Sequence, residues 1–322
     1  MSETARRPSL PAPSVPFPVS PMHAMRPDLR RLEGPVVVLD ALAPAYQAAK
    51  LQRLRRVPGR CLALAEPPAH DLDTALAAVL DRLADDGAAH PGSVPAVART
   101  AAGWRLAVPG VVLAREDWRV RDDPPALADT SSIDFLEALP PRLRAIHALG
   151  LALQDDWALM RLDAQGAARA ELLHVCFPSG WDPASKAGLD FLSIHAPVAD
   201  GEAVRTASRA LGATIVQRGP FERHVWTLAD GASLARHPAE ATAFSAPSLE
   251  DLYFRCERQV TVPLPSLGRA LFLIRVHVAP LLAVADDADR RSRLAQALGS
   301  MTPAVVAYKG LDAARALVTS RW

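Results

Sequence analysis

The stretch DLYFRCERQVTVPLPSLGRALFLIRVHVAPL, residues 251–281, decides the fold. It contains two runs rich in β-branched and aromatic residues, separated by a turn that holds proline and glycine. This pattern predicts two antiparallel strands that form a hairpin closing near Leu264–Gly268. Because helical patterns flank the hairpin on both sides, we expect an α+β chain with an antiparallel sheet and flanking helices.

Side-chain alternation predicts a polar patch on this hairpin. With the turn at Leu264–Gly268, Glu257 is expected roughly opposite Arg275, and Arg255 near His277. The patch is either the solvated face of a sheet or a half-buried pocket, where arginines require anions such as haem propionates or a substrate carboxylate. The expected faces are Tyr253, Arg255, Glu257 and Gln259 in the first strand, and Leu271, Leu273, Arg275 and His277 in the second.

A second stretch, HVCFPSGWDPASKAGLDFLSIHAPV at 174–198, predicts a helix that ends at a histidine. Asp182 is a candidate N-cap, Pro183 suits the first helical position, and Pro197 prevents the helix from continuing. We therefore expect a helix over about 183–194 with His195 on its last turn.

The predicted helix face beneath His195 is apolar with a gap. Leu192, Phe191 and Gly188 fall on this face at helical spacing. A flat ligand lying against the glycine would bring its centre within reach of the imidazole, which suggests a haem with a proximal histidine. The alternative is a structural histidine, stabilised by the helix dipole or by partners inside the core.

Composition narrows the class of protein. The 322 residues are half hydrophobic, and the net charge of +1 gives no basic surface for nucleic acid or an anionic membrane. Cys61, Cys176 and Cys256 are too few and too dispersed for a disulfide framework or an iron–sulfur cluster. The chain shows neither a leader peptide nor a long apolar span, so we expect a cytoplasmic protein.

The N-terminus differs in composition from the rest. Eight of the 29 prolines lie within residues 1–36, so we expect a disordered tail over 1–24. Residues 104–114 predict a hairpin around Pro-Gly, and residues 131–163 predict two helices that meet at Pro140-Pro141. No linker interrupts the remainder, so we expect a single domain over 25–322.

Several motifs together resemble one known family. Their order and spacing are similar to those of the haem-dependent oxidative N-demethylase alpha-subunit family, and the resemblance covers about residues 25–320. The motifs are CFPSGWDPASKAGLDFLSIHAPV (176–198), RHVW (223–226), LYFRCERQ (252–259), ALFLIRVHVAPL (270–281) and AYKGL (307–311), with weaker matches at MRPDLRRL and LQDDWALM.

This resemblance implies a PAS-like α+β domain that encloses a b-type haem. The implied activity is oxidative N-demethylation of a small methylated amine, with O2 and with electrons from a separate flavin and iron–sulfur reductase. No nucleotide-binding motif or cluster of iron–sulfur cysteines accompanies the motifs here, in keeping with an external reductase.

The resemblance also implies roles for individual residues. His195 is the expected iron ligand, with Gly188 beneath the haem. Arg255 and Arg275 are expected to bind the propionates, and Glu257 to steer an ammonium substrate or relay protons. Other positions assigned to the site are Gln259 and Trp226 beside the cofactor, and His224 and His277 as catalytic groups or distal ligands; the last two are alternatively ordinary, partly exposed histidines.

Departures from the family pattern favour further hypotheses. The chain has Val225 where the family usually has asparagine, Pro263 where it has a basic residue, and His277 where it has tyrosine. A haem-binding sensor or a catalytically silent subunit is therefore the main alternative. Two lesser alternatives are a thiolate ligand from Cys176 or Cys256, and acyl transfer at Ser179, which lacks a G-x-S-x-G elbow.

Overall fold

Two antiparallel sheets organise the chain in the computed structural model, which describes residues 15–122 and 130–322. The larger sheet has the order β1-β9-β10-β11-β7-β8-β2, and the smaller one the order β3-β4-β5-β6. The strands are β1 (Arg30–Arg31), β2 (Leu62–Leu64), β3 (Val97–Arg99), β4 (Gly103–Leu106), β5 (Val111–Ala114), β6 (Val120–Asp122), β7 (Asp156–Leu162), β8 (Ala168–His174), β9 (Phe221–Ala229), β10 (Tyr253–Leu264) and β11 (Arg269–Pro280).

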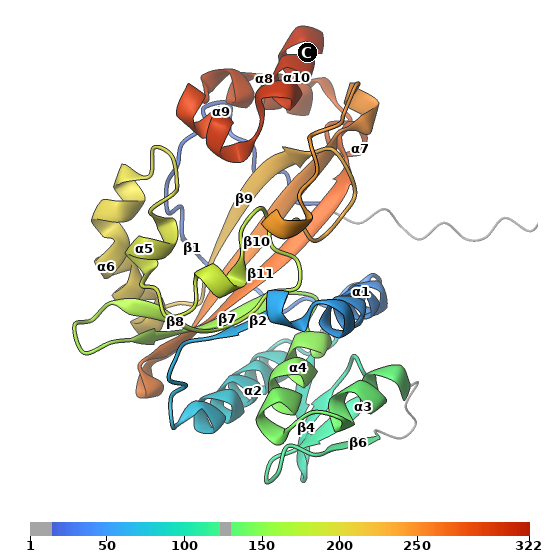
Figure 1. The fold of residues 1–322 in the computed structure, drawn as a ribbon, viewed down its shortest axis with the longest axis vertical. Helices are drawn as coiled ribbons and strands as arrows, with labels where there is room; N and C mark the ends of the chain where they lie inside the picture. The colour runs from blue at the N-terminus through green and yellow to red at the C-terminus, as the bar shows by residue number, and fades with distance from the viewer. Residues whose placement is uncertain (1–14, 123–129) are drawn as a thin grey trace, which may run out of the picture.

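Helices lie around the larger sheet, so the expected α+β class with antiparallel strands is confirmed. Figure 1 shows α5 and α6 beside the sheet, α8–α10 beyond one end of it, and α1, α2 and α4 with the smaller sheet at the other end. Within the described ranges, no helix has both the length and the apolar character needed to cross a bilayer. The helices are α1 (Ala43–Arg56), α2 (Leu72–Ala89), α3 (Thr130–Glu137), α4 (Pro141–Ala152), α5 (Phe191–His195), α6 (Glu202–Gln217), α7 (Leu281–Val284), α8 (Ala288–Ser300), α9 (Pro303–Lys309) and α10 (Asp312–Arg321).

The hairpin of β10 and β11 is present, but its register differs by one residue from the expectation. Leu264 pairs with Arg269, so the loop is Pro265–Gly268, a 3-10 turn that ends in a left-handed Gly268 (φ 60°). The expected pairing would have ended the loop one residue earlier. Because successive side chains alternate, this shift reverses the relative faces of the two strands.

Both sheets contribute to one large buried cluster. Trp104 of the smaller sheet, Leu80 of α2, and Trp157 and Leu273 of the larger sheet all belong to it. Such a shared core couples the two sheets through apolar contact. The expectation of a single domain over 25–322 is compatible with this arrangement and stays a prediction.

Part of the expected N-terminal tail lies outside the described residues, namely 1–14. The described remainder forms no helix or strand, yet it packs against the body of the protein. Val19 is 3% exposed within the cluster formed by β10 and the C-terminal helices, and the Phe17 ring lies 5.5 Å from that of Phe254.

Two other expectations have opposite outcomes. The Pro-Gly hairpin is confirmed as β4 and β5, while the second expected helix ends at Ala152 and its continuation is strand β7. The run Asp156–Met160 is buried throughout, and a strand covered on both faces has no polar side from which its period can be read.

We predict that Gly150→Ala destabilises the fold. A Cβ at this position of α4 would clash with Cε1 of His174, a fully buried ring that hydrogen-bonds His147 and stacks on Trp157. Overpacking of this kind costs about 1–3 kcal/mol. Urea unfolding measures the loss, and Gly59→Ala, which has nothing within 4 Å, is the matched control. Equal free energies of unfolding for the two variants would contradict the prediction.

Candidate functional site

The segment before His195 is not one helix. A 3-10 turn, Pro183–Ser185, is followed by a reversal at Gly188 (φ 76°) and then by the single turn of α5, capped by Asp190. Gly188 therefore lies outside the helix, with Ala65 as the nearest neighbour of a Cβ placed there. The prediction that Gly188 leaves a gap on the helix face beneath His195 is wrong, because Gly188 is left-handed and interrupts the helix.

His195 is held as a neutral imidazole with one nitrogen free of intramolecular partners among the described residues. Its Nδ1 lies 2.7 Å from the carbonyl oxygen of Phe191, which can only accept, so Nδ1 carries the proton. Burial lowers the pKa of His195, against a smaller opposing effect of this hydrogen bond. The unprotonated Nε2 is the form that binds metals, and its orientation is fixed by the bond on the other nitrogen.

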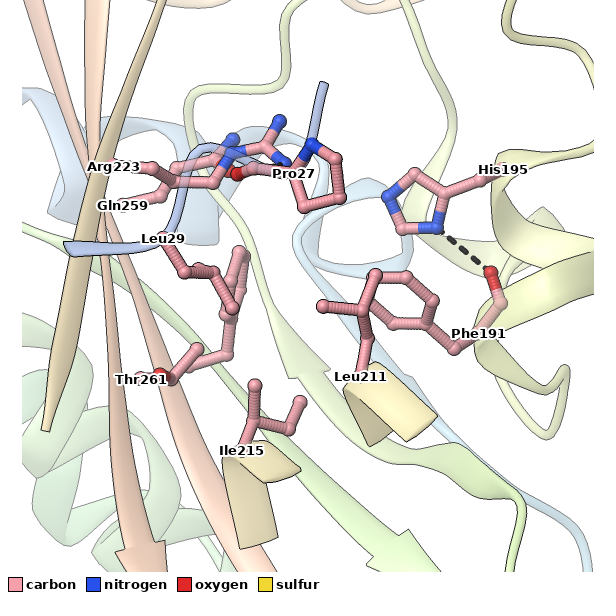
Figure 2. Close-up of a pocket in the computed structure, with 10 residues that line it drawn as sticks. Pro27, Leu29, Phe191, His195, Leu211, Ile215, Arg223, Gln259 and Thr261 are labelled. Atoms are coloured by element: carbon pink, nitrogen blue, oxygen red, sulfur yellow. Dashed lines mark hydrogen bonds between the residues drawn. The ribbon is translucent and has the colours of Figure 1, made fainter. Parts of the chain in front are cut away.

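A small pocket lies beside this imidazole. Figure 2 shows His195, Phe191 and Leu211 on one side, facing Arg223, Gln259, Leu29 and Thr261 on the other, with the second nitrogen of His195 turned away from Phe191. Its lining is mostly apolar with a few directed polar groups, which is the character of ligand sites. The lining residues are Pro27, Leu29, Phe191, His195, Leu211, Ile215, Arg223, Gln259, Thr261 and Phe272.

The polar groups on the sheet side are incompletely partnered. The hydroxyl of Thr261 is buried, with 2% of the residue exposed, and has no hydrogen-bond partner within residues 15–122 and 130–322. Arg223 donates to the carbonyl of Pro27 at 3.3 Å, which engages one of the five N–H donors of its guanidinium. Buried polar groups are normally satisfied, so these two indicate a site for a polar ligand.

Glu257 adjoins the pocket through a short network. Its carboxylate accepts from Ser179 Oγ and, at 2.7 Å, from the Nε2 of Gln259, which itself lines the pocket. Ser179 Oγ in turn accepts from Nε of Arg255 at 2.9 Å. The network fixes the carboxylate in one orientation. In the part of the chain that the structure describes, the side chains bound to Ser179 Oγ are Glu257 and Arg255, whereas acyl transfer would need a histidine base there.

Arg255 and Arg275 are not brought together. Arg255 is 1% exposed and donates to backbone carbonyls, at 3.1 Å to Phe177 and 3.2 Å to Ser233. Arg275 projects from the other face of the sheet, where it pairs with Asp40 at 2.8 Å. The expected joint patch is wrong because Glu257 pairs with Val276 and not with Arg275.

His224, His277 and Trp226 also lie on the face opposite the pocket. His224 pairs with Arg258, and His277 and Trp226 both pair with Cys256, whereas the neighbouring Gln259 faces the pocket. Trp226 stacks on Phe254, with ring centroids 6.0 Å apart, in the cluster shared with α8–α10. The roles expected for these three residues beside His195 are therefore incompatible with their positions.

Of the predicted site residues, the structure brings His195 and Gln259 into one pocket, with Glu257 next to it. Arg223, Thr261 and the N-terminal Leu29 were missed. Arg223 had a sequence signal, because it opens the RHVW motif. Leu29 had a weaker signal, because it lies in the MRPDLRRL match, and the pairing of β1 with β9 brings it to the pocket.

Metal binding by side chains alone lacks a ligand set here. In the described part of the chain, no group of three histidine, cysteine or acidic residues converges. Burial raises the pKa of both Cys176 and Cys256, which favours neutral thiols over thiolate ligands.

We predict that His277 makes the protein sensitive to acid. Burial, aided by Arg275, lowers the pKa of His277 from 6.5 to about 4, so between these values the unfolded chain binds more protons than the folded one. The free energy of unfolding therefore falls as the pH falls through this window. In His277→Gln the decrease from pH 7 to pH 5 should be smaller by on the order of 1 kcal/mol, measured by urea unfolding.

The exposed His70 provides the control, since His70→Gln also removes one imidazole. Its decrease between pH 7 and pH 5 should match that of the wild-type protein. An identical decrease in His277→Gln and in the wild-type protein would exclude His277 as a source of the sensitivity.

Comparison with known proteins adds one finding. A family model described as haem-dependent oxidative N-demethylase, alpha subunit-like, matches residues 126–319. The matched region includes His195 and the strands that line the pocket, whereas Pro27 and Leu29 lie outside it. No curated protein matches the chain.

Proposed function

This chain belongs to the haem-dependent oxidative N-demethylase alpha subunit-like family, and from that premise we propose that it binds a b-type haem in the pocket beside His195. The proposed reaction is oxidative removal of a methyl group from a small amine, with O2 and electrons from a separate reductase. The proposal includes a PAS-like arrangement, in which the antiparallel sheet and the helices beside it enclose the haem within a single domain over 25–322.

The observation that carries the proposal is the state of His195. Its Nδ1 is bound to the Phe191 carbonyl, so Nε2 is the nitrogen available to iron. A bound porphyrin would supply the remaining nitrogen ligands of the iron. Apolar lining residues such as Leu211 and Phe272 suit the porphyrin body, and the incompletely partnered polar groups suit its periphery.

In this proposal the cofactor, when bound, supplies the oxygen and redox chemistry, and the protein supplies position and protons. His195 holds the iron from the side of α5. The apolar walls exclude water from the reacting centre. Glu257, oriented by Ser179 and Gln259, binds the ammonium group of the substrate or passes a proton held on its carboxylate.

A haem-binding sensor or a catalytically silent subunit is the second candidate. It is favoured by Val225, which pairs with Glu257 and offers no hydrogen bond where the family pattern has asparagine. Both candidates require His195 as the iron ligand. They differ in whether a substrate is turned over.

We predict that His195→Ala abolishes the Soret spectrum of a histidine-bound haem. The protein is purified with haem supplied, and absorbance is recorded for the wild-type protein and the variant. His224→Ala, which removes an imidazole from the opposite face of the sheet, should keep the wild-type spectrum. A wild-type spectrum in His195→Ala would remove His195 from the proposed site.

We further predict oxygen consumption that depends on a methylated amine. The haem-loaded protein is supplied with a chemical or enzymatic reductant and a panel of small secondary and tertiary methylamines, and formaldehyde is measured alongside O2. In Glu257→Gln the rate should fall by about 10²–10⁴-fold, the range for loss of a general acid or base. A Soret band without amine-dependent uptake in the wild-type protein would favour the sensor or silent subunit.

A further inference from the structure

Three buried or half-buried cations surround Glu257 without forming ion pairs. They are Arg223, Arg255 and Lys309, whose charges interact with that carboxylate at longer range. In the described ranges none of the three has a carboxylate within ion-pair distance, and their hydrogen bonds go mainly to backbone carbonyls. On the opposite face of the same sheet, other arginines of β10 and β11 form ion pairs with acidic side chains. These pairs are Arg258 with Glu222, Arg269 with Glu171 and Arg275 with Asp40.

Lys309 is the last residue of α9, and its side chain reaches the backbone of strand β9. Its Nζ donates to the carbonyl of Trp226 at 2.9 Å, and the neighbouring Val225 pairs with Glu257 in the sheet. Two of the three N–H donors of the ammonium therefore have no partner in these contacts. Burial lowers the pKa of Lys309 to about 8, opposed by attraction to Glu257 and reinforced by Arg223.

Arg223 lies two residues before Val225 on the same face of β9 and pairs with Gln259 of the pocket. Its hydrogen bond to the Pro27 carbonyl is long, at 3.3 Å, and carries no charge compensation. Burial lowers the pKa of Arg223. Arg255 differs from both, since its guanidinium is enclosed by Ser179 and by the carbonyls of Phe177 and Ser233.

Two cations of this region lack a charge partner in direct contact. Asp28 attracts Arg223 and Asp156 attracts Arg255 from beyond ion-pair distance, and among the described residues Arg223 and Lys309 are left with backbone carbonyls as their hydrogen-bond partners. Burying a cation is costly unless an anion compensates it. These two cations match a ligand that brings two anionic groups, and a single carboxylate substrate would pair with only one of them.

We propose that Arg223 and Lys309 form an anion-binding pair that holds the two propionate groups of the porphyrin. This inference rests on the proposed function and extends it, because it assigns the propionate contacts to two residues other than Arg255 and Arg275. Arg223 exchanges the Pro27 carbonyl for a carboxylate, with which a guanidinium forms two parallel hydrogen bonds. Lys309 contributes its remaining ammonium donors from the end of α9.

The test compares ferric protoporphyrin IX with its dimethyl ester, which keeps the iron and the ring but lacks both carboxylates. Affinities are measured by Soret titration for the wild-type protein, Arg223→Gln, Lys309→Met and the double variant. The wild-type protein should prefer the diacid by about 10–100-fold for each charge-assisted contact. Each single variant should lose the contribution of one contact to the preference for the diacid. The double variant should bind both porphyrins almost equally.

Arg275→Gln is the matched control, because it removes a buried arginine from the opposite face and should keep the full preference. Thermal unfolding checks that each variant is folded. Should a neutral variant fail to fold, Arg223→Lys and Lys309→Arg replace it, and these should retain a preference for the diacid with an altered ratio.

An unchanged preference in folded variants overturns the inference while leaving His195 and haem binding intact. Absence of binding of either porphyrin to the wild-type protein overturns the proposed function as well. The two failures are therefore distinguishable in the same titration.

Discussion

The hydrogen-bond register between β10 and β11 determines what this protein can bind. With Glu257 paired to Val276, the side chains of Gln259, Thr261 and Phe272 line the pocket beside His195. The same register sends Arg275 and His277 to the other face. A shift by one residue would exchange these two sets, so the four-residue loop Pro265–Gly268 sets the composition of a pocket far from it.

The strands of this hairpin could be predicted from the sequence, but their register could not. Alternation and β-branched residues identify a strand without reference to its partner, whereas the register depends on how many residues the turn uses. The turn contains a 3-10 segment before Gly268, and the length of this turn could not be predicted from the sequence pattern. Strand β7 was missed because its buried run has no polar period, and the helix expected over 183–194 failed at the left-handed Gly188.

The sequence predicted those residues of the candidate site that have a recognisable position or motif of their own. His195 was identified by its place before a proline stop, and Gln259 by its motif, and both line the pocket. The charged residues could not be sorted in this way, because the partners of an arginine are set by the fold. Arg255 is bound by Ser179 and backbone carbonyls and Arg275 by Asp40, while Arg223, to which no role was assigned, has one hydrogen bond to the described residues.

The N-terminal segment gives the pocket one wall that is distant in the chain. Pro27 and Leu29 reach it because β1 pairs with β9, and the Arg223–Pro27 contact joins residues 196 positions apart. During synthesis this segment leaves the ribosome long before β9 exists, so it has no partner until most of the chain has been made. The wall formed by Pro27 and Leu29 can therefore close the pocket only once β9 has been synthesised.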